Sequence, residues 1–355
     1  MNFDYNEEQQ LLADSVRRFL QDKYQFEERK KILAGEGWSP RVWATFAEMG
    51  LTGLPLPAEH GGFGGGAVDL MGVMEAFGEA LVVEPYLATV MAARLVGRGG
   101  SEAQKSAILP AVAEGKLKLA FAHEEEGARF RLDHVKLSAD KNVLKGEKKA
   151  VLGAPVADRF VVSARNASGV ELFLAGKPQI KAYRTLDGML AADLVFQGVP
   201  AEPLKGGLTA IEEVTDFATA LICAEAVGAM KFACDTTLEY LKTRKQFGVP
   251  IGTFQALQHR IVDMVISYEQ AKSMACLACS KVDSFENAAD RARAVSSAKI
   301  KIADSARHVS QEAVQLHGGM GMSEELKVSH AFRRLTVLAR QFGDADHHLA
   351  RFAAA

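Results

Sequence analysis

Two aspartates and two histidines lie within five residues near the C-terminus, in the stretch FGDADHHLARF, residues 342–352. Aspartate and histidine can bind metals or exchange protons near neutral pH. The same stretch also fits the polar face of a short last helix. There, His347 and His348 would point about 100° apart and share no ligand, while Asp344 would cap the helix and Asp346 would favour its positive end. A metal site needs a further ligand cluster, which the sequence does not offer, so we expect no metal.

The four cysteines, Cys223, Cys234, Cys276 and Cys279, offer little chemistry. The last two form a C-x-x-C motif, but in the run KSMACLACSK, which has the pattern of the middle of a helix. A redox C-x-x-C normally lies where a strand enters a helix, because the helix N-terminus lowers the thiol pKa. We therefore interpret the cysteines as small buried apolar residues.

Two longer segments carry residue types suited to a phosphate-bearing ligand: YLKTRKQFGVPIGTFQALQHRIVDM, residues 240–264, and QEAVQLHGGMGMSEELKVSHAFRR, residues 311–334. Arg244 is a planar, permanently charged group that matches a pyrophosphate. Phe247 can pack beside a cofactor, and the glycine and proline after it turn the chain out of a helix. In the second segment, the HGGMG run ends a helix with glycines that let backbone amides approach a ligand closely.

The bulk composition limits the class of protein. A chain of 355 residues predicts two or three domains, and 48% hydrophobic with 24% charged residues is an ordinary globular balance. The net charge is −2 and there is no long basic stripe, so we expect no nucleic-acid or membrane partner. No apolar run approaches the roughly 18 residues of a membrane span. The acidic start, MNFDYNEEQQ, carries no secretory signal, which favours a cytoplasmic location.

The order of sequence patterns predicts an α+β protein, mostly α, in three domains. Residues 1–116 have helical patterns, and Asn6 with Gln9 is a candidate capping box at the start of the first helix. Residues 117–205 hold short β-branched and aromatic runs separated by turn residues, which predict a small antiparallel barrel or sandwich. Of the two we expect the β-barrel.

Residues 206–355 return to long helices and predict a four-helix bundle. Their clearest signal lies in residues 295–316, where apolar positions recur at steps of three and four. These positions are Val295, Ala298, Ile302, Ala306, Val309, Ala313 and Leu316.

This domain order, together with the segments 240–264 and 311–334, resembles the acyl-CoA dehydrogenase family, and the resemblance covers nearly the whole chain. Within the family, the chain looks most like the small subunits of pimeloyl-CoA-type dehydrogenases, which pair with a larger homologous subunit. The resemblance implies FAD as cofactor and α,β-dehydrogenation of an acyl-CoA thioester. In that reaction a carboxylate removes a proton from Cα while hydride leaves Cβ for the flavin.

The resemblance also implies which residues contact FAD. The position of Arg244 binds the pyrophosphate in the family. The positions of Phe247, Phe254 and Gln255 line the same cofactor. Those of Gln315, Gly318 and Gly319 meet the adenosine end from a neighbouring subunit.

The catalytic base is missing where the family carries it. The two family positions for the glutamate fall on Phe342 and Ala218, and neither can take a proton. Asp216 matches a family aspartate used near the bound CoA chain, which makes it a candidate for substrate binding. Glu225, two helical turns past Ala218, and Asp344, just after Phe342, are the remaining candidates for a base in this chain.

The predicted β domain departs from the family as well. Where the family has its flavin-side loop, this chain reads HEEEGARF, residues 123–130, and only Glu124 agrees. The family's flavin-flanking Trp and Thr are replaced by Ala150 and Leu152. The half-site for the flavin ring is therefore eroded, while the half that reaches a neighbour's FAD is intact.

We therefore expect the small chain of a heterotetramer whose larger subunit carries the catalytic glutamate. Two alternatives stay open: a non-catalytic structural partner, and a homodimeric enzyme with a displaced base such as Glu225 or Asp344. The resemblance implies an electron-transfer flavoprotein as oxidant. Small residues at 150 and 218 would admit a bulky acyl group, such as a dicarboxylyl, aromatic or steroid side-chain thioester. We expect a role in fatty acid or steroid side-chain catabolism.

Overall fold

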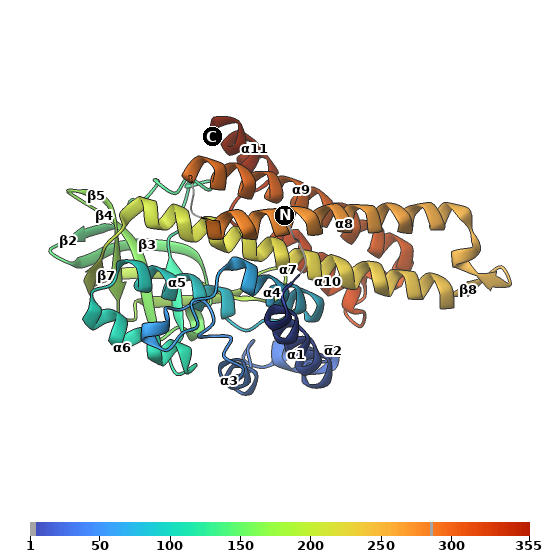
Figure 1. Cartoon of the computed structure of the whole chain (residues 1–355), viewed down its shortest axis with the longest axis horizontal. Coiled ribbons are helices and arrows are strands. Elements are labelled where there is room, and N and C mark those ends of the chain that lie inside the picture. The colour runs from blue at the N-terminus through green and yellow to red at the C-terminus, as the bar shows by residue number, and fades with distance from the viewer. Residues whose placement is uncertain (1–4, 285–286) are drawn as a thin grey trace. The chain divides into compact units, whose positions relative to one another are not determined.

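The structure of the chain is a computed structural model that describes residues 5–284 and 287–355. Eleven α-helices lie within these residues (Figure 1): α1 (Glu7–Lys23), α2 (Phe26–Ala34), α3 (Pro40–Glu48), α4 (Ala67–Ala80), α5 (Tyr86–Gly99), α6 (Glu102–Ala113), α7 (Gly207–Thr243), α8 (Gln255–Ser284), α9 (Ala288–His317), α10 (Lys327–Leu338) and α11 (Ala345–Ala354). Four short 3-10 helices lie in the connections between these described elements: η1 (Ala58–His60), η2 (Ala154–Val156), η3 (Ile251–Thr253) and η4 (Gly318–Met322).

Local signals in the sequence account for where the helices begin and which face they bury. The Asn6 side chain accepts a hydrogen bond from the Gln9 amide at 2.8 Å, and the Gln9 side chain accepts one from the Asn6 amide at 3.0 Å. The predicted capping box at the start of α1 is thus confirmed. All seven positions of the predicted stripe in residues 295–316 of α9 are buried, which confirms that face of the helix.

In the described part of the chain, nine strands form two sheets. The larger sheet contains β1 (Leu119–Ala122), β2 (Ser138–Asp140), β3 (Val143–Leu152), β4 (Arg159–Asn166), β5 (Gly169–Ala175), β6 (Gln179–Arg184) and β7 (Leu190–Leu204), and the smaller one contains β8 (Lys245–Gln246) and β9 (Val249–Pro250). In the larger sheet, β4 pairs with β2, β2 with β3, β3 with β7, β7 with β5, and β5 again with β4. This circuit closes the sheet into the predicted small barrel, around a core that includes Leu144, Phe160, Leu194 and Phe196. The β2–β4 pairing is parallel, so the barrel is not antiparallel throughout as predicted. Strand β1 extends it parallel to β4, and β6 pairs with β7.

By packing, the chain forms two compact units. The first unit takes residues through Lys30, then Ala67–Val82 and Thr219–Ala355; the second takes Lys31–Gly66 and Val83–Ala218. The second unit contains the barrel, with α5 packed against β1.

In the first unit, α8 and α9 run side by side, as Figure 1 shows, and α10 and α11 pack on α9. Helices α4 and α7 meet backbone to backbone at two glycines. A Cβ on Gly78 would lie 1.9 Å from the Glu225 carbonyl oxygen, and one on Gly228 would lie 1.9 Å from the Glu75 carbonyl oxygen. Only glycine allows this approach.

The fold class predicted from the sequence is confirmed: helices flank a closed β-barrel on both sides in the chain order. Helix α7 is the one helix of the described part of the chain that is long and apolar enough to cross a membrane. However, 89% of its apolar window is buried inside the protein, as is typical of a core helix. The predicted domain limits 1–116, 117–205 and 206–355 stay a prediction.

Candidate functional site

A tight hairpin follows α7 and carries the first of the segments singled out in the sequence. Lys245 pairs with Pro250 and Gln246 with Val249, and the two loop residues, Phe247 and Gly248, both have positive φ, 53° and 80°. Two positive φ values are typical of a type I′ turn, which a phenylalanine enters only at some cost. The turn holds the Phe247 side chain outside the protein, 91% exposed.

Arg244 stands at the junction of α7 and this hairpin. Its main chain is fixed at both sides, since its amide donates to the Tyr240 carbonyl and its carbonyl accepts from the Ile251 amide, each at 2.8 Å. The side chain is exposed, and within residues 5–284 and 287–355 the guanidinium has no ion-pair or hydrogen-bond partner. An unpaired guanidinium on a fixed backbone is suited to an anion supplied from outside the chain.

The second segment contains the end of α9 and the glycines that follow it, which face outward. Gly318 has φ 61° and ψ −145°, a conformation that only glycine adopts readily. A Cβ on Gly318 or Gly319 would meet no atom within 4 Å. Among the residues that the structure describes, none requires glycine at 319, and the backbone there is open to a ligand. Gln315, one turn earlier, is exposed as well.

One aromatic stack brings the two segments together. The Tyr240 ring, in the last turn of α7, stacks on the ring of His317, the last residue of α9, at 4.4 Å between centroids. His317 is buried, and its Nδ1 donates to the Ala313 carbonyl at 2.8 Å. Burial lowers the pKa of His317, which keeps the ring neutral for stacking. We call residues 244–255 and 315–322 the hairpin end of the first unit.

Apolar side chains are exposed over the hairpin end and along α8. Phe247 and Phe254 contact each other edge to face at 6.2 Å. The other exposed large apolar residues of this region are Val249, Val262, Val265, Ile266, Met320 and Met322. Gln255, the first residue of α8, is exposed among them. A surface of this kind is typical of a protein interface.

The structure brings all seven residues predicted to contact FAD to this one end, in two segments about sixty residues apart in the chain. Arg244, Gln315 and the open glycine backbone together fit the diphosphate and adenosine part of a dinucleotide. The aromatic rings of Phe247 and Phe254 would flank it. Tyr240 and His317 were missed by sequence reasoning, although both lie within the segments it singled out.

Both remaining candidates for a base already make hydrogen bonds within the chain. Glu225 accepts two hydrogen bonds from the Arg334 guanidinium, at 2.6 and 2.7 Å, and both side chains are buried. Removing Glu225 would take from this buried cation a carboxylate that accepts two of its hydrogen bonds. Asp344 caps α11 by accepting from the His347 amide at 2.9 Å, as the sequence predicted. Asp216 is buried in α7, in the second unit.

Polar residues of α9 and α11 fix the loop that carries Phe342. Its main chain has φ 60°, and its carbonyl accepts from His348 Nε2 at 3.1 Å. His348 Nδ1 lies 3.3 Å from Ser296 Oγ, and Lys299 Nζ donates to the Leu338 carbonyl. Sequence reasoning missed Ser296 and Lys299; their signal was that polar residues fall on the buried stripe of α9.

His347 and His348, in the aspartate- and histidine-rich stretch near the C-terminus, therefore have structural roles. His348 is buried, and His347 contacts it edge to face on α11. Among the described residues, no group of three His, Cys, Asp or Glu side chains could hold a metal ion. Cys223, Cys234 and Cys279 are buried and Cys276 is half-buried, and both members of the C-x-x-C lie within α8, as expected.

In the second unit, the loop at residues 123–130 is closed by a buried cation. Lys148 is fully buried in β3, and its Nζ donates to the His123 carbonyl, to Glu125 Oε1 and to Ser163 Oγ, at 2.8 to 2.9 Å. Ser163 in turn lies 2.9 Å from His123 Nδ1. Burial, and then the Lys148 charge, lower the pKa of His123 to about 3. All three Nζ protons are used, two by the loop and one by Ser163 of β4, so this cation is unavailable to an outside ligand.

The glycines predict separable effects on folding and binding. We expect Gly318→Ala to lower the free energy of unfolding by about 1–3 kcal/mol, because alanine resists that backbone conformation. We expect Gly319→Ala to leave it within about 0.5 kcal/mol but to reduce FAD content, because the new methyl group blocks the open backbone. Urea unfolding and flavin absorbance measure the two effects. Equal FAD content in wild type and Gly319→Ala would contradict the assignment.

Two buried histidines predict acid sensitivity. Burial is the main cause that lowers the pKa of both His123 and His348 to about 3. The folded chain then binds fewer protons than the unfolded chain, so stability is lost as the pH falls below about 6.5. At pH 5, each histidine is expected to cost about 2 kcal/mol relative to pH 8. Urea unfolding at the two pH values should show a smaller loss for His348→Gln; an unchanged loss would contradict this.

Comparisons with known proteins identify the family of this chain. Residues 6–116 match the family model for the acyl-CoA dehydrogenase N-terminal domain, and residues 205–355 match that for the C-terminal domain. The chain is 29% identical over 330 residues to a 3-(aryl)acrylate reductase of Clostridium sporogenes, covering 84% of this chain and 85% of the relative. It is 27% identical over 356 residues to acyl-CoA dehydrogenase IpdE2 of Mycolicibacterium smegmatis, covering 98% and 99%.

Several solved structures share the fold of this chain. The Tcur3481-Tcur3483 steroid ACAD superposes with a TM-score of 0.90 at 27% identity, covering 98% of this chain and 97% of that chain. The ChsE4-ChsE5 complex from Mycobacterium tuberculosis gives a TM-score of 0.92 at 24% identity, covering 100% and 98%, and supports the fold. The chain therefore belongs to the acyl-CoA dehydrogenase family, whose members are FAD-dependent oxidoreductases that act on CH–CH bonds.

Proposed function

We propose that this chain is the small subunit of a heteromeric, pimeloyl-CoA-type acyl-CoA dehydrogenase. It would bind the adenosine and pyrophosphate part of an FAD, and a larger homologous subunit would bind most of the flavin ring. One contrast carries the proposal. The hairpin end presents an unpaired Arg244 and open glycine backbone, whereas the barrel loop of the same chain uses its own polar groups internally around Lys148.

Each residue of the hairpin end has a defined role in this proposal. Arg244 neutralises the pyrophosphate with charge-assisted hydrogen bonds. Phe247 and Phe254 pack along the cofactor, while Gln255 and Gln315 offer hydrogen bonds to its polar edges. The backbone at Gly318 and Gly319 lies against the adenosine end.

The reaction would be α,β-dehydrogenation of an acyl-CoA thioester. When bound, FAD supplies the acceptor for the hydride that leaves Cβ. The base that removes the Cα proton would be a glutamate of the larger subunit, since Glu225 is held by Arg334 and Asp344 by the cap of α11. Asp216 would lie near the CoA chain, because it matches the family position.

The exposed apolar face of α8 supports a large partner. Val262, Val265 and Ile266 are 40–53% exposed on successive turns, which favours burial against another subunit. We infer a cytoplasmic heterotetramer, three domains with limits at 116 and 205, and an electron-transfer flavoprotein as oxidant. The name of the similar steroid ACAD favours a bulky acyl group, such as a steroid side chain or a long fatty acid.

Co-purification tests the heteromer directly. The chain expressed alone is expected to be colourless, and to gain FAD when it is expressed with a larger homologous subunit. A yellow homo-oligomer that reduces its flavin with an acyl-CoA would instead favour the homodimeric enzyme with a displaced base. A two-chain complex that forms without FAD would favour the non-catalytic structural partner.

A further inference from the structure

A cavity of about 450 Å³ lies within the first unit, away from the residues proposed to grip FAD. Helices α1, α2, α4, α7 and α10 line it. Its apolar and aromatic wall consists of Leu20, Tyr24, Phe26, Ala76, Ala80 and Phe232. This volume falls in the range of small-molecule sites, which are mostly apolar with a few placed polar groups.

Two of the three cations on the cavity wall are already compensated. Arg17 lies 3.4 Å from Glu75 and 3.7 Å from Glu79. Lys231 lies 3.3 Å from Glu79 and 2.6 Å from Asp235. These pairs use the carboxylates of the wall, so they add little net charge to the cavity.

Lys327, the third cation, has no carboxylate partner among residues 5–284 and 287–355. Its Nζ donates to the main-chain carbonyl of Glu79 at 2.6 Å and lies 4.1 Å from the centroid of the Phe232 ring. A carbonyl and an aromatic face both attract an ammonium, but neither neutralises it. The side chain is half-buried, so its positive charge is poorly solvated beside an apolar wall.

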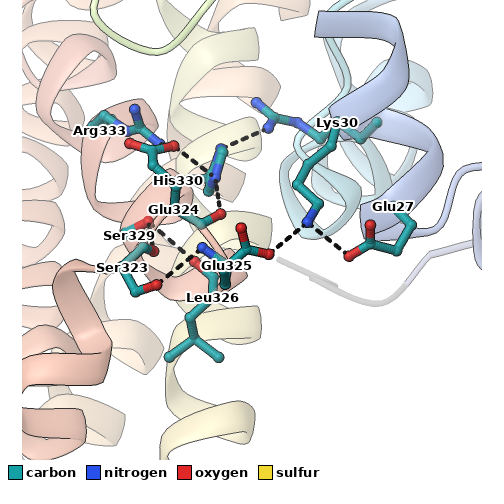
Figure 2. A network of polar contacts seen from close by, with 10 residues as sticks. Glu27, Lys30, Ser323, Glu324, Glu325, Leu326, Ser329, His330 and Arg333 are labelled. Carbon is teal, nitrogen blue, oxygen red and sulfur yellow. Dashed lines mark hydrogen bonds and ion pairs between the residues drawn. The ribbon is translucent and has the colours of Figure 1, made fainter. Parts of the chain in front are cut away.

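A polar network fixes the backbone from which Lys327 extends. Figure 2 shows Lys30 of α2 reaching Glu325, at 2.9 Å, while Ser329 of α10 donates to the Ser323 carbonyl at 2.7 Å. The start of α10 is thereby tied both to its own preceding loop and to α2. Because α2 also carries Phe26, the network holds the cation and one aromatic wall of the cavity in fixed relation.

We propose that this cavity binds a small organic anion, with its carboxylate on the Lys327 ammonium and an aromatic or branched apolar body against Tyr24, Phe26 and Phe232. The carboxylate neutralises the positive charge of Lys327, and the apolar body fills the rest of the cavity. The site is independent of the proposed FAD contacts.

The charge of Lys327 makes binding depend on pH. Burial, and then the positive charge of Arg29, lower the pKa of Lys327 to about 8, while Glu79 acts in the opposite direction. The other charged groups facing the cavity, Arg17, Lys231 and Asp235, carry the pairs described above. Above pH 8 the free lysine is neutral, so the anion is expected to bind more weakly there. Lys327→Arg keeps its charge and is expected to bind with little change up to pH 9.5.

Calorimetric titration of the full chain, with its partner where one co-purifies, tests the site with phenylacetate as the probe. We expect saturable binding with Kd about 1 mM or tighter at pH 7, a loss of at least tenfold in Lys327→Gln, and a similar loss for the wild type at pH 9.5. Ala80→Phe fills the cavity and should abolish binding while the thermal unfolding midpoint is kept. Arg244→Ala should bind phenylacetate normally, which separates this site from the FAD contacts.

Several outcomes would overturn the proposal. These are no binding of phenylacetate, equal affinity for the neutral 2-phenylethanol, equal affinity for inorganic phosphate alone, and unchanged binding in both Lys327→Gln and Ala80→Phe.

Discussion

Arg244→Ala is expected to weaken FAD retention by the purified complex about 10- to 100-fold, the largest effect on binding that we predict. The guanidinium is exposed, unpaired within the described chain, and fixed at its backbone by Tyr240 and Ile251. Charge-assisted hydrogen bonds of this kind contribute about 1.5–3 kcal/mol. Folding should be unaffected, because the side chain makes no contact that stabilises the unit.

Flavin absorbance after dialysis, at equal concentrations of complex, measures the effect. Arg307→Ala is a suitable control, since Arg307 on α9 is also highly exposed and makes only a loose pair with Asp304 at 3.8 Å. We expect the control to retain FAD like the wild type. Full flavin content in Arg244→Ala would remove the main support for the proposed role of the hairpin end.

Glu225→Gln is expected to lower the free energy of unfolding by about 3–5 kcal/mol, the largest effect on stability. The loss arises because buried Arg334 loses two charge-assisted hydrogen bonds to the Glu225 carboxylate. Replacing both residues by methionine should recover most of it, since both charges of the buried pair are then gone. Urea unfolding of the single and double variants measures these differences.

A matched surface pair provides the control. Arg260 and Glu312 form a similar two-bond pair, at 2.6 and 3.0 Å, but are partly exposed. Glu312→Gln should therefore cost only about 1 kcal/mol or less. The same variants test catalysis, because the folded Glu225→Gln complex should keep its turnover. A complex that stays folded yet loses all turnover would identify Glu225 as the base.

Local patterns in the sequence were sufficient for much of the fold. The capping box at Asn6, the buried stripe of α9 and the cap at Asp344 each depend on residues three or four positions apart, and all three are found. The short strands of residues 117–205 were predicted from β-branched and aromatic runs separated by turn residues, which are also local signals.

The candidate site was only partly predictable, because its contacts join residues that are far apart in the sequence. The two segments at 240–264 and 311–334 were singled out from residue types, but the Tyr240–His317 stack that joins them depends on tertiary packing. Glu225 was a candidate base in the sequence, and only the fold reveals that Arg334, 109 residues away in the chain, holds its carboxylate.

The sequence by itself determined the order of helices and strands, the family, and the absence of a base at positions 218 and 342. The tertiary structure decided which polar groups are satisfied and which are left open: Lys148 is enclosed, Arg244 is exposed without a partner, and Lys327 faces a cavity. The physical reason is that helix and strand patterns arise from neighbours a few residues apart. The solvation and pairing of a charge depend instead on groups that only folding brings near.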